Sequence, residues 1–242
     1  MAKYTLCIIS LALHGIIVSM KNLIFDYDGT LHETMRIYGP AFRKNYENLV
    51  SRGLAPAREF SDAEISGWLG FTAADMWNRF APQLSDEEKA ACSRRIQEEM
   101  ARLIENGTAE LYPGVPELMD RFRREGYTIL LLSNCKTGYL ERHRKQFGLD
   151  RWFHGYYWSE GYGWKTKTEI LKLLIKEHPG PSVMIGDRIL DMKCAADCGI
   201  PSVGCTYGYA ASPEEFASAA FIAESPEKLP GIIQRVFSSD KT

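Results

Sequence analysis

The chain has 242 residues, of which 45% are hydrophobic and 25% charged, with a formal net charge of −2 and an isoelectric point near 6.2. This is ordinary globular usage, and the length allows one core domain with a sizeable insertion. The near-neutral charge and the lack of a basic stripe argue against sequence-independent nucleic-acid binding, since the arginine-rich stretches 121–124 and 142–145 lie on expected helices beside acidic residues.

Residues 1–19 form an apolar extension of uncertain role. The stretch from Thr5 to Val18 is mostly apolar, and Lys3 precedes it, as in a short signal sequence. It is too short for a comfortable membrane span and has no small-x-small cleavage site. We rank a translation-start artefact first, then an extra strand or helix on the core, then a weak anchor. No membrane partner is expected.

Two acidic residues follow the first predicted strand. The sequence Asp26-Tyr27-Asp28-Gly29-Thr30 comes directly after the apolar run Leu23-Ile24-Phe25. Such a run fits a strand of a parallel sheet, whose carboxyl edge opens into a crevice. Two carboxylates at this spacing would share one face of an extended strand, and the glycine lets the backbone turn sharply. Taken alone, the pair fits a solvated turn as well.

The interval from Asp28 to Ser133 is too long for one crossover and has a helical pattern throughout. The first helix is predicted from Met35 to Arg52 and another from Thr72 to Phe80. Capping-box patterns at 61–64 and 85–88 open two more, and the last of them ends before Gly107. We therefore predict an inserted helical domain over residues 35–107 and a discontinuous core made of residues 20–34 and 108–242.

The later predicted strands also end in polar side chains. The strand from Tyr127 ends in Ser133-Asn134, and the strand from Ser182 ends in Gly186-Asp187, with Asp191 four residues further on. The segment between them carries Lys165 and Lys167 just before an amphipathic helix. Alternating strands and helices predict an α/β fold, a parallel sheet with helices on both faces.

Along the chain these clusters are an acidic pair, a hydroxyl, a lysine and a second acidic pair. Together they suit a phosphoryl group and a divalent cation, because hard cations take oxygen ligands. The set strongly resembles the four motifs of the haloacid dehalogenase superfamily of phosphohydrolases, over residues 21 to about 237. The resemblance implies a Rossmann-like three-layer α/β/α core, a helical cap of the first class, a Mg²⁺ cofactor and catalysis through an aspartyl-phosphate.

By this resemblance Asp26 is the nucleophile, and Asp28 is the general acid that later serves as the base. A carboxylate is a competent nucleophile for phosphoryl transfer, and the rest of catalysis is mostly positioning and electrostatic stabilisation. Ser133 is expected to donate to a phosphoryl oxygen, with the backbone amide of Asn134 as a second donor. Residues implied as further metal or substrate contacts are Asp187, Asp191, Gly29 and Thr30.

The implied metal ligands are one carboxylate oxygen of Asp26, the backbone carbonyl of Asp28 and the side chain of Asp187. Asp191 would hold the cation directly or through water.

Two lysines compete for the place beside the phosphate. Lys165 has the spacing of the family's Lys-Pro-x-Pro-Glu form, with threonines in place of both prolines. Lys167 has the spacing of the phosphoserine-phosphatase form, Lys-x-Glu-Ile-Leu. The segment from Thr166 to Glu169 has a capping-box pattern that would fix Lys167 in the first helical turn. We therefore predict Lys167 as the catalytic lysine and keep Lys165 as a substrate contact.

Other segments have weaker signals. Leu69-Gly70-Phe71 resembles the substrate-facing loop of phosphoglycolate-phosphatase-like members, so Gly70 and Phe71 are predicted substrate contacts. Nearby Trp77 is at least as typical of a small core within the cap. Arg188 is expected to be exposed or salt-bridged rather than to bind phosphate. Tyr207-Gly208-Tyr209 is expected to pack on the surface rather than to line the crevice.

The predicted function is Mg²⁺-dependent hydrolysis of a small phosphomonoester, with phosphoglycolate-like and nucleotide substrates as the nearest candidates. A sugar-phosphate mutase similar to β-phosphoglucomutase is an alternative, because Asp28 occurs in both classes; a catalytically silent binding module is a weaker one. The expected partner is a small phosphorylated metabolite, and the protein is expected to be a monomer or homodimer. Six cysteines without a Cys-x-x-Cys pair favour a reduced, cytoplasmic location.

Overall fold

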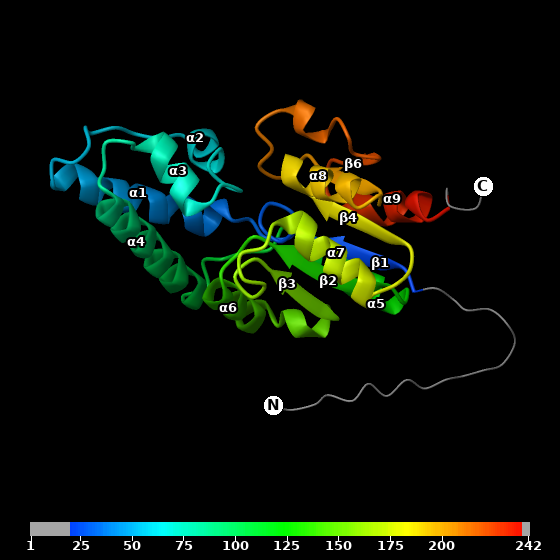
Figure 1. Cartoon of the computed structure of the whole chain (residues 1–242). Helices are drawn as coiled ribbons and strands as arrows, with labels where there is room; N and C mark the ends of the chain where they lie inside the picture. Colours follow the sequence, from blue (N-terminus) through cyan, green and yellow to red (C-terminus); the bar gives the residue numbers. More distant parts are fainter. Residues whose placement is uncertain (1–19, 239–242) are drawn as a thin grey trace, which may run out of the picture.

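The computed structural model describes residues 20–238 (Figure 1). The apolar extension predicted over residues 1–19 lies outside the described residues. In the described part, no helix is long and apolar enough to cross a membrane.

The described chain forms one parallel sheet with the strand order β3-β2-β1-β4-β5-β6. The strands are β1 (Asn22–Phe25), β2 (Thr128–Ser133), β3 (Gly155–Trp158), β4 (Ser182–Gly186), β5 (Ser202–Cys205) and β6 (Phe221–Ala223). In register, Phe25 at the end of β1 lies beside Leu131 of β2 and Ile185 of β4. The residues that follow these three strands therefore meet at one edge of the sheet.

Side chains alternate between the two faces of the sheet along each strand, so the apolar strands present buried residues on both faces. Helices cover both faces. Leu23 and Phe25 pack on one face with α5 (Val115–Arg124), α6 (Thr137–Phe147) and α9 (Leu229–Val236). Ile24 packs on the other face with α7 (Lys167–Glu177) and α8 (Ile189–Asp197). Short 3₁₀ turns occur at Leu149–Arg151, Pro213–Phe216 and Pro226–Lys228. The predicted three-layer α/β/α fold is confirmed.

The remaining helices form a separate layer beside the carboxyl edge of the sheet, which we call the helical unit (Figure 1). They are α1 (Met35–Ser51), α2 (Asp62–Ser66), α3 (Ala73–Phe80) and α4 (Asp86–Glu105). Phe42 and Trp77 are fully buried in a core that these helices make among themselves. The unit occupies the interval predicted for the inserted domain.

The two capping boxes predicted in the helical unit differ in the structure. Ser61 and Glu64 form the complete reciprocal pair at the start of α2. At α4, Ser85 accepts from the backbone amide of Glu88, but the Glu88 carboxylate does not return to the cap. It binds Arg52 and Arg95 instead, since two guanidinium donors outcompete one backbone amide.

Candidate active site

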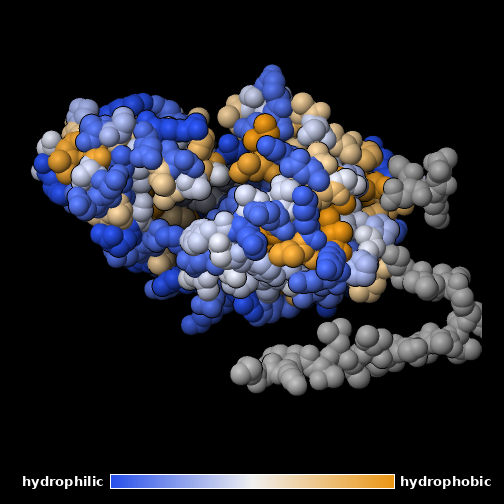
Figure 2. Space-filling view, in the orientation of Figure 1, coloured by the Kyte–Doolittle hydropathy of each residue, from blue (hydrophilic) through white to orange (hydrophobic). Residues whose placement is uncertain are grey.

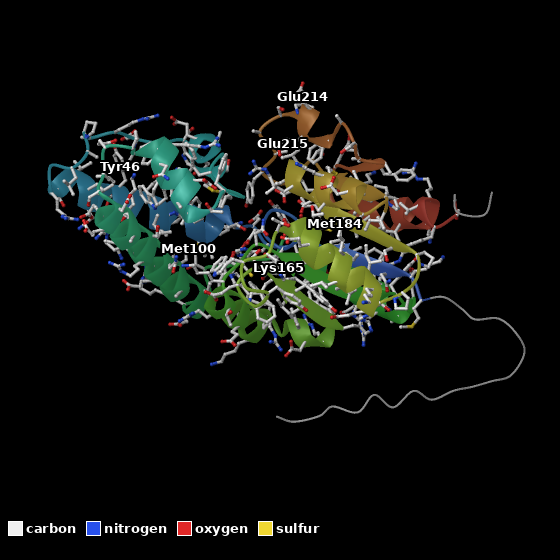
Figure 3. The ribbon with its side chains drawn as sticks, in the orientation of Figure 1. Tyr46, Met100, Lys165, Met184, Glu214 and Glu215 are labelled. Carbon is white, nitrogen blue, oxygen red and sulfur yellow. The ribbon has the colours of Figure 1, made fainter. Side chains whose placement is uncertain are left out.

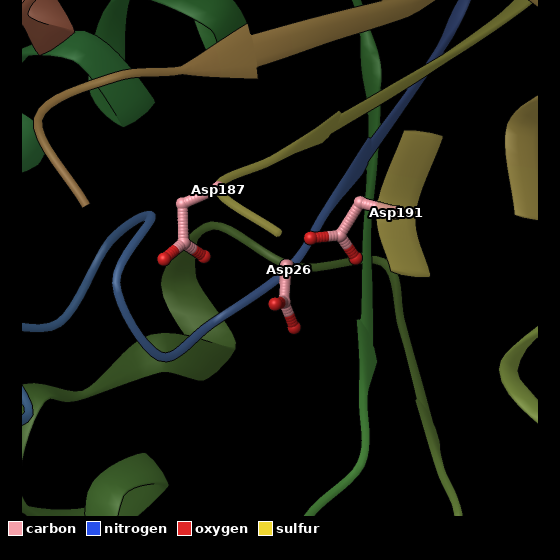
Figure 4. A group of neighbouring side chains, drawn as sticks. All are labelled: Asp26, Asp187 and Asp191. Atoms are coloured by element: carbon pink, nitrogen blue, oxygen red, sulfur yellow. The ribbon is translucent and has the colours of Figure 1, made fainter. Parts of the chain in front are cut away.

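Three aspartates come together where β1 and β4 end. Asp26 follows β1, Asp187 follows β4, and Asp191 lies in the first turn of α8. All three are buried, and one carboxylate oxygen from each lies within 4.8 Å of the others (Figure 4). The adjacency of β1 and β4 in the sheet places two of them, and the start of α8 turns the third back toward the strand ends. Three of the four aspartates in the two predicted acidic pairs thus form one cluster, which does not include Asp28.

Lys167 contacts this cluster from the start of α7. Its Nζ lies 2.9 Å from Asp26 Oδ1 and 2.5 Å from Asp191 Oδ1, and the side chain is 6% exposed. Thr166 and Glu169 make the predicted capping box, which fixes the first turn of α7 and aims Lys167 at the sheet edge. Lys165 lies on the exposed loop before α7, outside the cluster (Figure 3). The structure therefore brings only one of the two candidate lysines to the carboxylates.

Burial, together with the crowding of negative charge, raises the pKa of two carboxyls. Burial, with the charge of Asp191, raises the pKa of Asp26 to about 7, and Lys167 offsets part of the effect. Burial and the charges of Asp26 and Asp191 hold the pKa of Asp187 well above its usual range. Buried carboxylates in excess over the neighbouring ammonium, all with oxygen donors, fit a hard divalent cation.

Asp28 has a different environment from Asp26 although it lies two residues away. Its side chain is 30% exposed, and its Oδ1 accepts from Thr34 Oγ1 at 2.7 Å and from Tyr139 Oη at 2.5 Å. Burial alone would raise its pKa, but these bonds and His32 outweigh burial and lower the pKa below the ordinary value. In the metal-free protein these contacts favour the ionised form of Asp28, whereas burial favours the protonated form of Asp26; a divalent cation bound at Asp26 would favour its ionised form instead.

A small cavity of about 180 Å³ opens above the cluster. Ser133 at the end of β2 and Asn134 after it, the two predicted phosphoryl donors, both line this cavity. The Asn134 side chain accepts a hydrogen bond from Ser159 at 2.8 Å, which ties the loop after β2 to the loop after β3. The cavity is also lined by Asp26, Asp28, Lys167, Asp187, Asp191 and Arg188.

Gly29 and Thr30, predicted as substrate contacts, do not line this cavity. Thr30 is fully buried, and its hydroxyl donates to Asp187 Oδ1 at 3.2 Å. Gly29 has a φ of +77°, and a Cβ there would lie 2.1 Å from Asp187 Oδ2. The prediction is corrected because the chain turns behind Asp187 after Asp28, so both residues support that carboxylate rather than face the opening.

The segment Tyr207-Gly208-Tyr209 also differs from expectation. It follows β5, next to β4, and its backbone lies against Asp187, where a Cβ on Gly208 would be 2.3 Å from the Asp187 Cβ. The amide of Tyr209 donates to Asp187 Oδ2 at 2.7 Å, and its ring lines the small cavity. Its place directly after β5, the strand that pairs with β4, is the sequence signal for this contact.

Arg188 connects the sheet edge to the helical unit. It forms the expected kind of ion pair, with Nε 3.1 Å from Glu215, and it also donates to the backbone carbonyl of Leu69. It reaches the loop 69–71 from the core side. The predicted loop residues Gly70 and Phe71 line the small cavity next to it.

A larger cavity of about 570 Å³ lies between the helical unit and the core, where Figure 2 shows the surface hollowed. Asp28, Asn134, Gly70 and Phe71 line both cavities, so the two are continuous around Asp28. The larger one is otherwise mostly apolar, with Trp68, Met76, Ile96, Met100 and Ile104 in its wall. Trp77 borders it but belongs mainly to the helical unit's own core, where its Nε1 donates to Ser93.

A parallel sheet whose carboxyl edge gathers three buried carboxylates, a lysine and a serine under a helical layer defines an α/β protein with a site suited to a divalent cation and a phosphoryl group. The family model of the haloacid dehalogenase-like hydrolases matches residues 20–199. The chain therefore belongs to the haloacid dehalogenase-like hydrolase family, and the assignment to its phosphohydrolases is confirmed.

The chain aligns with two curated relatives over most of the length of each. A phosphoglycolate phosphatase of Vibrio vulnificus is 27% identical over 226 residues, covering 88% of this chain and 96% of that protein. A 5'-nucleotidase of Pseudomonas aeruginosa is 27% identical over 205 residues, covering 80% and 86%. The crystal structure of a predicted phosphoglycolate phosphatase from Haemophilus somnus superposes with a TM-score of 0.77 at 19% identity, over 90% of this chain and 99% of that one. That likeness shows the fold.

Proposed function

We propose that this chain is a Mg²⁺-dependent phosphatase that hydrolyses a small phosphomonoester through an aspartyl-phosphate on Asp26. The observation that carries the proposal is the position of Asp26, buried beside Lys167, Asp187 and Asp191 at the base of a cavity that Asp28 also lines. One carboxylate is thereby held for attack, and a second, Asp28, lines the same cavity and is placed for proton transfer.

The Mg²⁺ ion would be held by the side chains of Asp26, Asp187 and Asp191 and by the carbonyl of Asp28, and it would supply positive charge to offset that of the phosphoryl oxygens. Asp26 attacks phosphorus, the ester bond breaks, and Asp28 protonates the departing alcohol. Water then attacks the aspartyl-phosphate while Asp28 takes its proton, which releases inorganic phosphate and restores Asp26.

The surrounding residues position the phosphoryl group during both displacements. Lys167 and the hydroxyl of Ser133 stabilise its oxygens, and the amide of Asn134 adds a donor. The helical unit acts as the cap: Gly70 and Phe71 face the leaving group, and Arg188 holds their loop through the carbonyl of Leu69. A cap over this edge excludes bulk water from the reaction.

Two substrate classes have separate support. Phosphoglycolate is favoured by relatives named for that activity. A nucleotide, or another ester with a larger and partly apolar leaving group, is favoured by the 570 Å³ cavity, since glycolate has only two carbons and the wall is rich in aromatic and aliphatic side chains. One relative is named a 5'-nucleotidase. The proposed partner is in either case a small phosphorylated metabolite; cytoplasmic location and a monomeric or dimeric state stay predictions.

We expect the purified protein to release phosphate from at least one member of a broad panel of phosphorylated metabolites when Mg²⁺ is present. Turnover near the usual enzymatic range, on the order of 1 to 10³ s⁻¹, is expected for the preferred ester. A chelator should remove it. The panel includes phosphoglycolate, nucleoside monophosphates and sugar phosphates. No release from any ester would refute the phosphatase, and isomerisation of a sugar phosphate without release would establish the mutase alternative.

The effect of Mg²⁺ on thermal unfolding is expected to depend on pH. The folded-state pKa of Asp26, about 7, lies above the ordinary 3.8. In metal-free protein, folded Asp26 binds a proton more tightly than unfolded Asp26, and this adds on the order of a few kcal/mol to the free energy of unfolding. This stabilisation is fully present below pH 3.8 and is lost as pH rises through about 7. Mg²⁺ needs the ionised carboxylates, so the rise in Tm that it causes should be larger at about pH 8 than at about pH 5.5.

The matched control for this measurement is Asp187→Asn, which removes one proposed ligand and should show a much smaller Mg²⁺-induced rise in Tm at either pH. An equal, large rise in both proteins would place the bound Mg²⁺ elsewhere in the molecule.

A further inference from the structure

The two carboxylate oxygens of Asp28 are held unequally. Oδ1 lies within hydrogen-bond distance of Tyr139 Oη, Thr34 Oγ1 and His32 Nδ1, at 2.5, 2.7 and 3.2 Å. Within residues 20–238, no hydrogen bond reaches Oδ2. Because Asp28 lines both cavities, the oxygen without a protein partner is the one available to a leaving group or to water.

The three partners of Oδ1 can all be donors at once. Tyrosine and threonine hydroxyls have one hydrogen each, and here each donates it to Oδ1. His32 Nδ1 can donate in the same direction when it carries a hydrogen, since it lies 3.2 Å from Asp28 Oδ1 and 3.0 Å from Thr34 Oγ1. The convergence on one oxygen is therefore chemically consistent.

Tyr139 makes the shortest of these bonds, and it comes from an element outside the sequence motifs. It lies on α6, and its ring centroid is 4.3 Å from that of His143, which is fully buried. The Nδ1 of His143 lies 2.8 Å from the hydroxyl of Tyr27, the residue between the two catalytic aspartates. Tyr139 is thus fixed by packing on a helix of the core, and its hydroxyl has little freedom to leave Asp28.

We propose that Tyr139 is a positioning residue for Asp28: by binding Oδ1 it keeps Oδ2 directed at the leaving-group oxygen for proton transfer. The inference rests on the proposed function of Asp28 as general acid. Thr34 lies close in sequence to Asp28, between β1 and α1, whereas Tyr139 anchors the carboxylate to a helix of the core. Without that anchor the carboxylate can rotate about its side-chain bonds, and the proton donor loses its alignment.

The test is Tyr139→Phe, which keeps the ring packed on His143 and removes only the hydroxyl. We compare kcat/KM, which covers the steps up to departure of the alcohol, for 4-nitrophenyl phosphate and for the best alkyl phosphomonoester of the panel. The alkyl ester needs a proton on its leaving oxygen and should lose roughly 10 to 100-fold. The nitrophenyl ester leaves without one and should lose about threefold or less.

The matched control is Tyr157→Phe, which removes a hydroxyl on β3 that donates to Glu177 at 2.7 Å, far along the chain from Asp28. It should leave the ratio of the two kcat/KM values unchanged. Equal losses on both esters in Tyr139→Phe, or no loss on either, would overturn the proposal, since a general loss of stability has no preference for the leaving group.

A crystal structure of Tyr139→Phe gives a readout that does not need activity. The Asp28 carboxylate should be rotated or occupy more than one orientation in the variant. An Asp28 with Oδ1 still fixed on Thr34 in a single orientation would refute the positioning role, whatever the activity. If wild-type protein hydrolyses neither ester, the proposed function fails, and the orientation of Asp28 still decides what Tyr139 does.

Discussion

Asp26→Asn is expected to lower phosphate release by a factor of about 10⁴ or more, the largest effect predicted for any single substitution in this chain. The amide that replaces the carboxylate has no charged oxygen to attack phosphorus, so the two-step route through an aspartyl-phosphate is closed. The same change removes a proposed Mg²⁺ ligand. The measurement is kcat with the best substrate of the panel, at saturating Mg²⁺, and it needs a protein that remains folded.

Folding of the variant is itself informative. Asp26 is buried among like charges that raise its pKa, so removing its charge relieves repulsion in the metal-free protein, whose Tm should not fall. Asp86→Asn is the matched control: the same change of side chain on a fully exposed residue of α4, with no expected effect on kcat. Equal phosphate release by wild-type protein and Asp26→Asn would rule out the aspartyl-phosphate mechanism.

The sheet and the acidic cluster could be predicted because both depend on local patterns. Short apolar runs separated by helical periodicity determine a parallel α/β sheet, and residues at the ends of adjacent parallel strands must meet. Asp26 and Asp187 are such residues. The capping box at Thr166 placed Lys167 by the same kind of local rule, since a helix start fixes the direction of its first side chains.

The contacts that the sequence did not reveal are made by loops and by helix faces whose pairing is tertiary. Tyr139 reaches Asp28 across 111 residues of sequence, and no periodicity in α6 distinguishes it from a packing tyrosine. Thr30 and Tyr209 were misplaced for a related reason. A residue after a strand can turn toward the opening or behind its neighbour, and the choice depends on how the adjacent loop packs.

Glu88 illustrates the same limit within a motif. The four-residue pattern at Ser85 is a capping box by sequence, yet the carboxylate binds Arg52, which is 36 residues distant. Local patterns give the alternatives open to a side chain, and tertiary partners of higher charge decide among them.

Lys167→Met is expected to reduce kcat by about 10² to 10³-fold, and Lys165→Met by less than about twofold. Methionine fills the space of the lysine stem but has no charge, so the phosphoryl oxygens lose a cation that lies 2.9 Å from the nucleophile. Lys165 is exposed on the loop before α7, where solvent screens its charge. The two lysines are two residues apart and undergo the same substitution, so they control for each other.

Thermal stability should also distinguish the two lysine variants. Lys167 is buried between Asp26 and Asp191, and its loss leaves two carboxylates without their ammonium partner. The metal-free Lys167→Met protein should therefore have a lower Tm than wild type. The difference should be clearest above pH 7, where Asp26 is ionised. Mg²⁺ should recover part of this loss, because a cation between the carboxylates offsets the same charge. A Lys165→Met protein that lost activity while Lys167→Met retained it would reverse the assignment, and the phosphate would then bind on the loop before α7 rather than at the sheet edge.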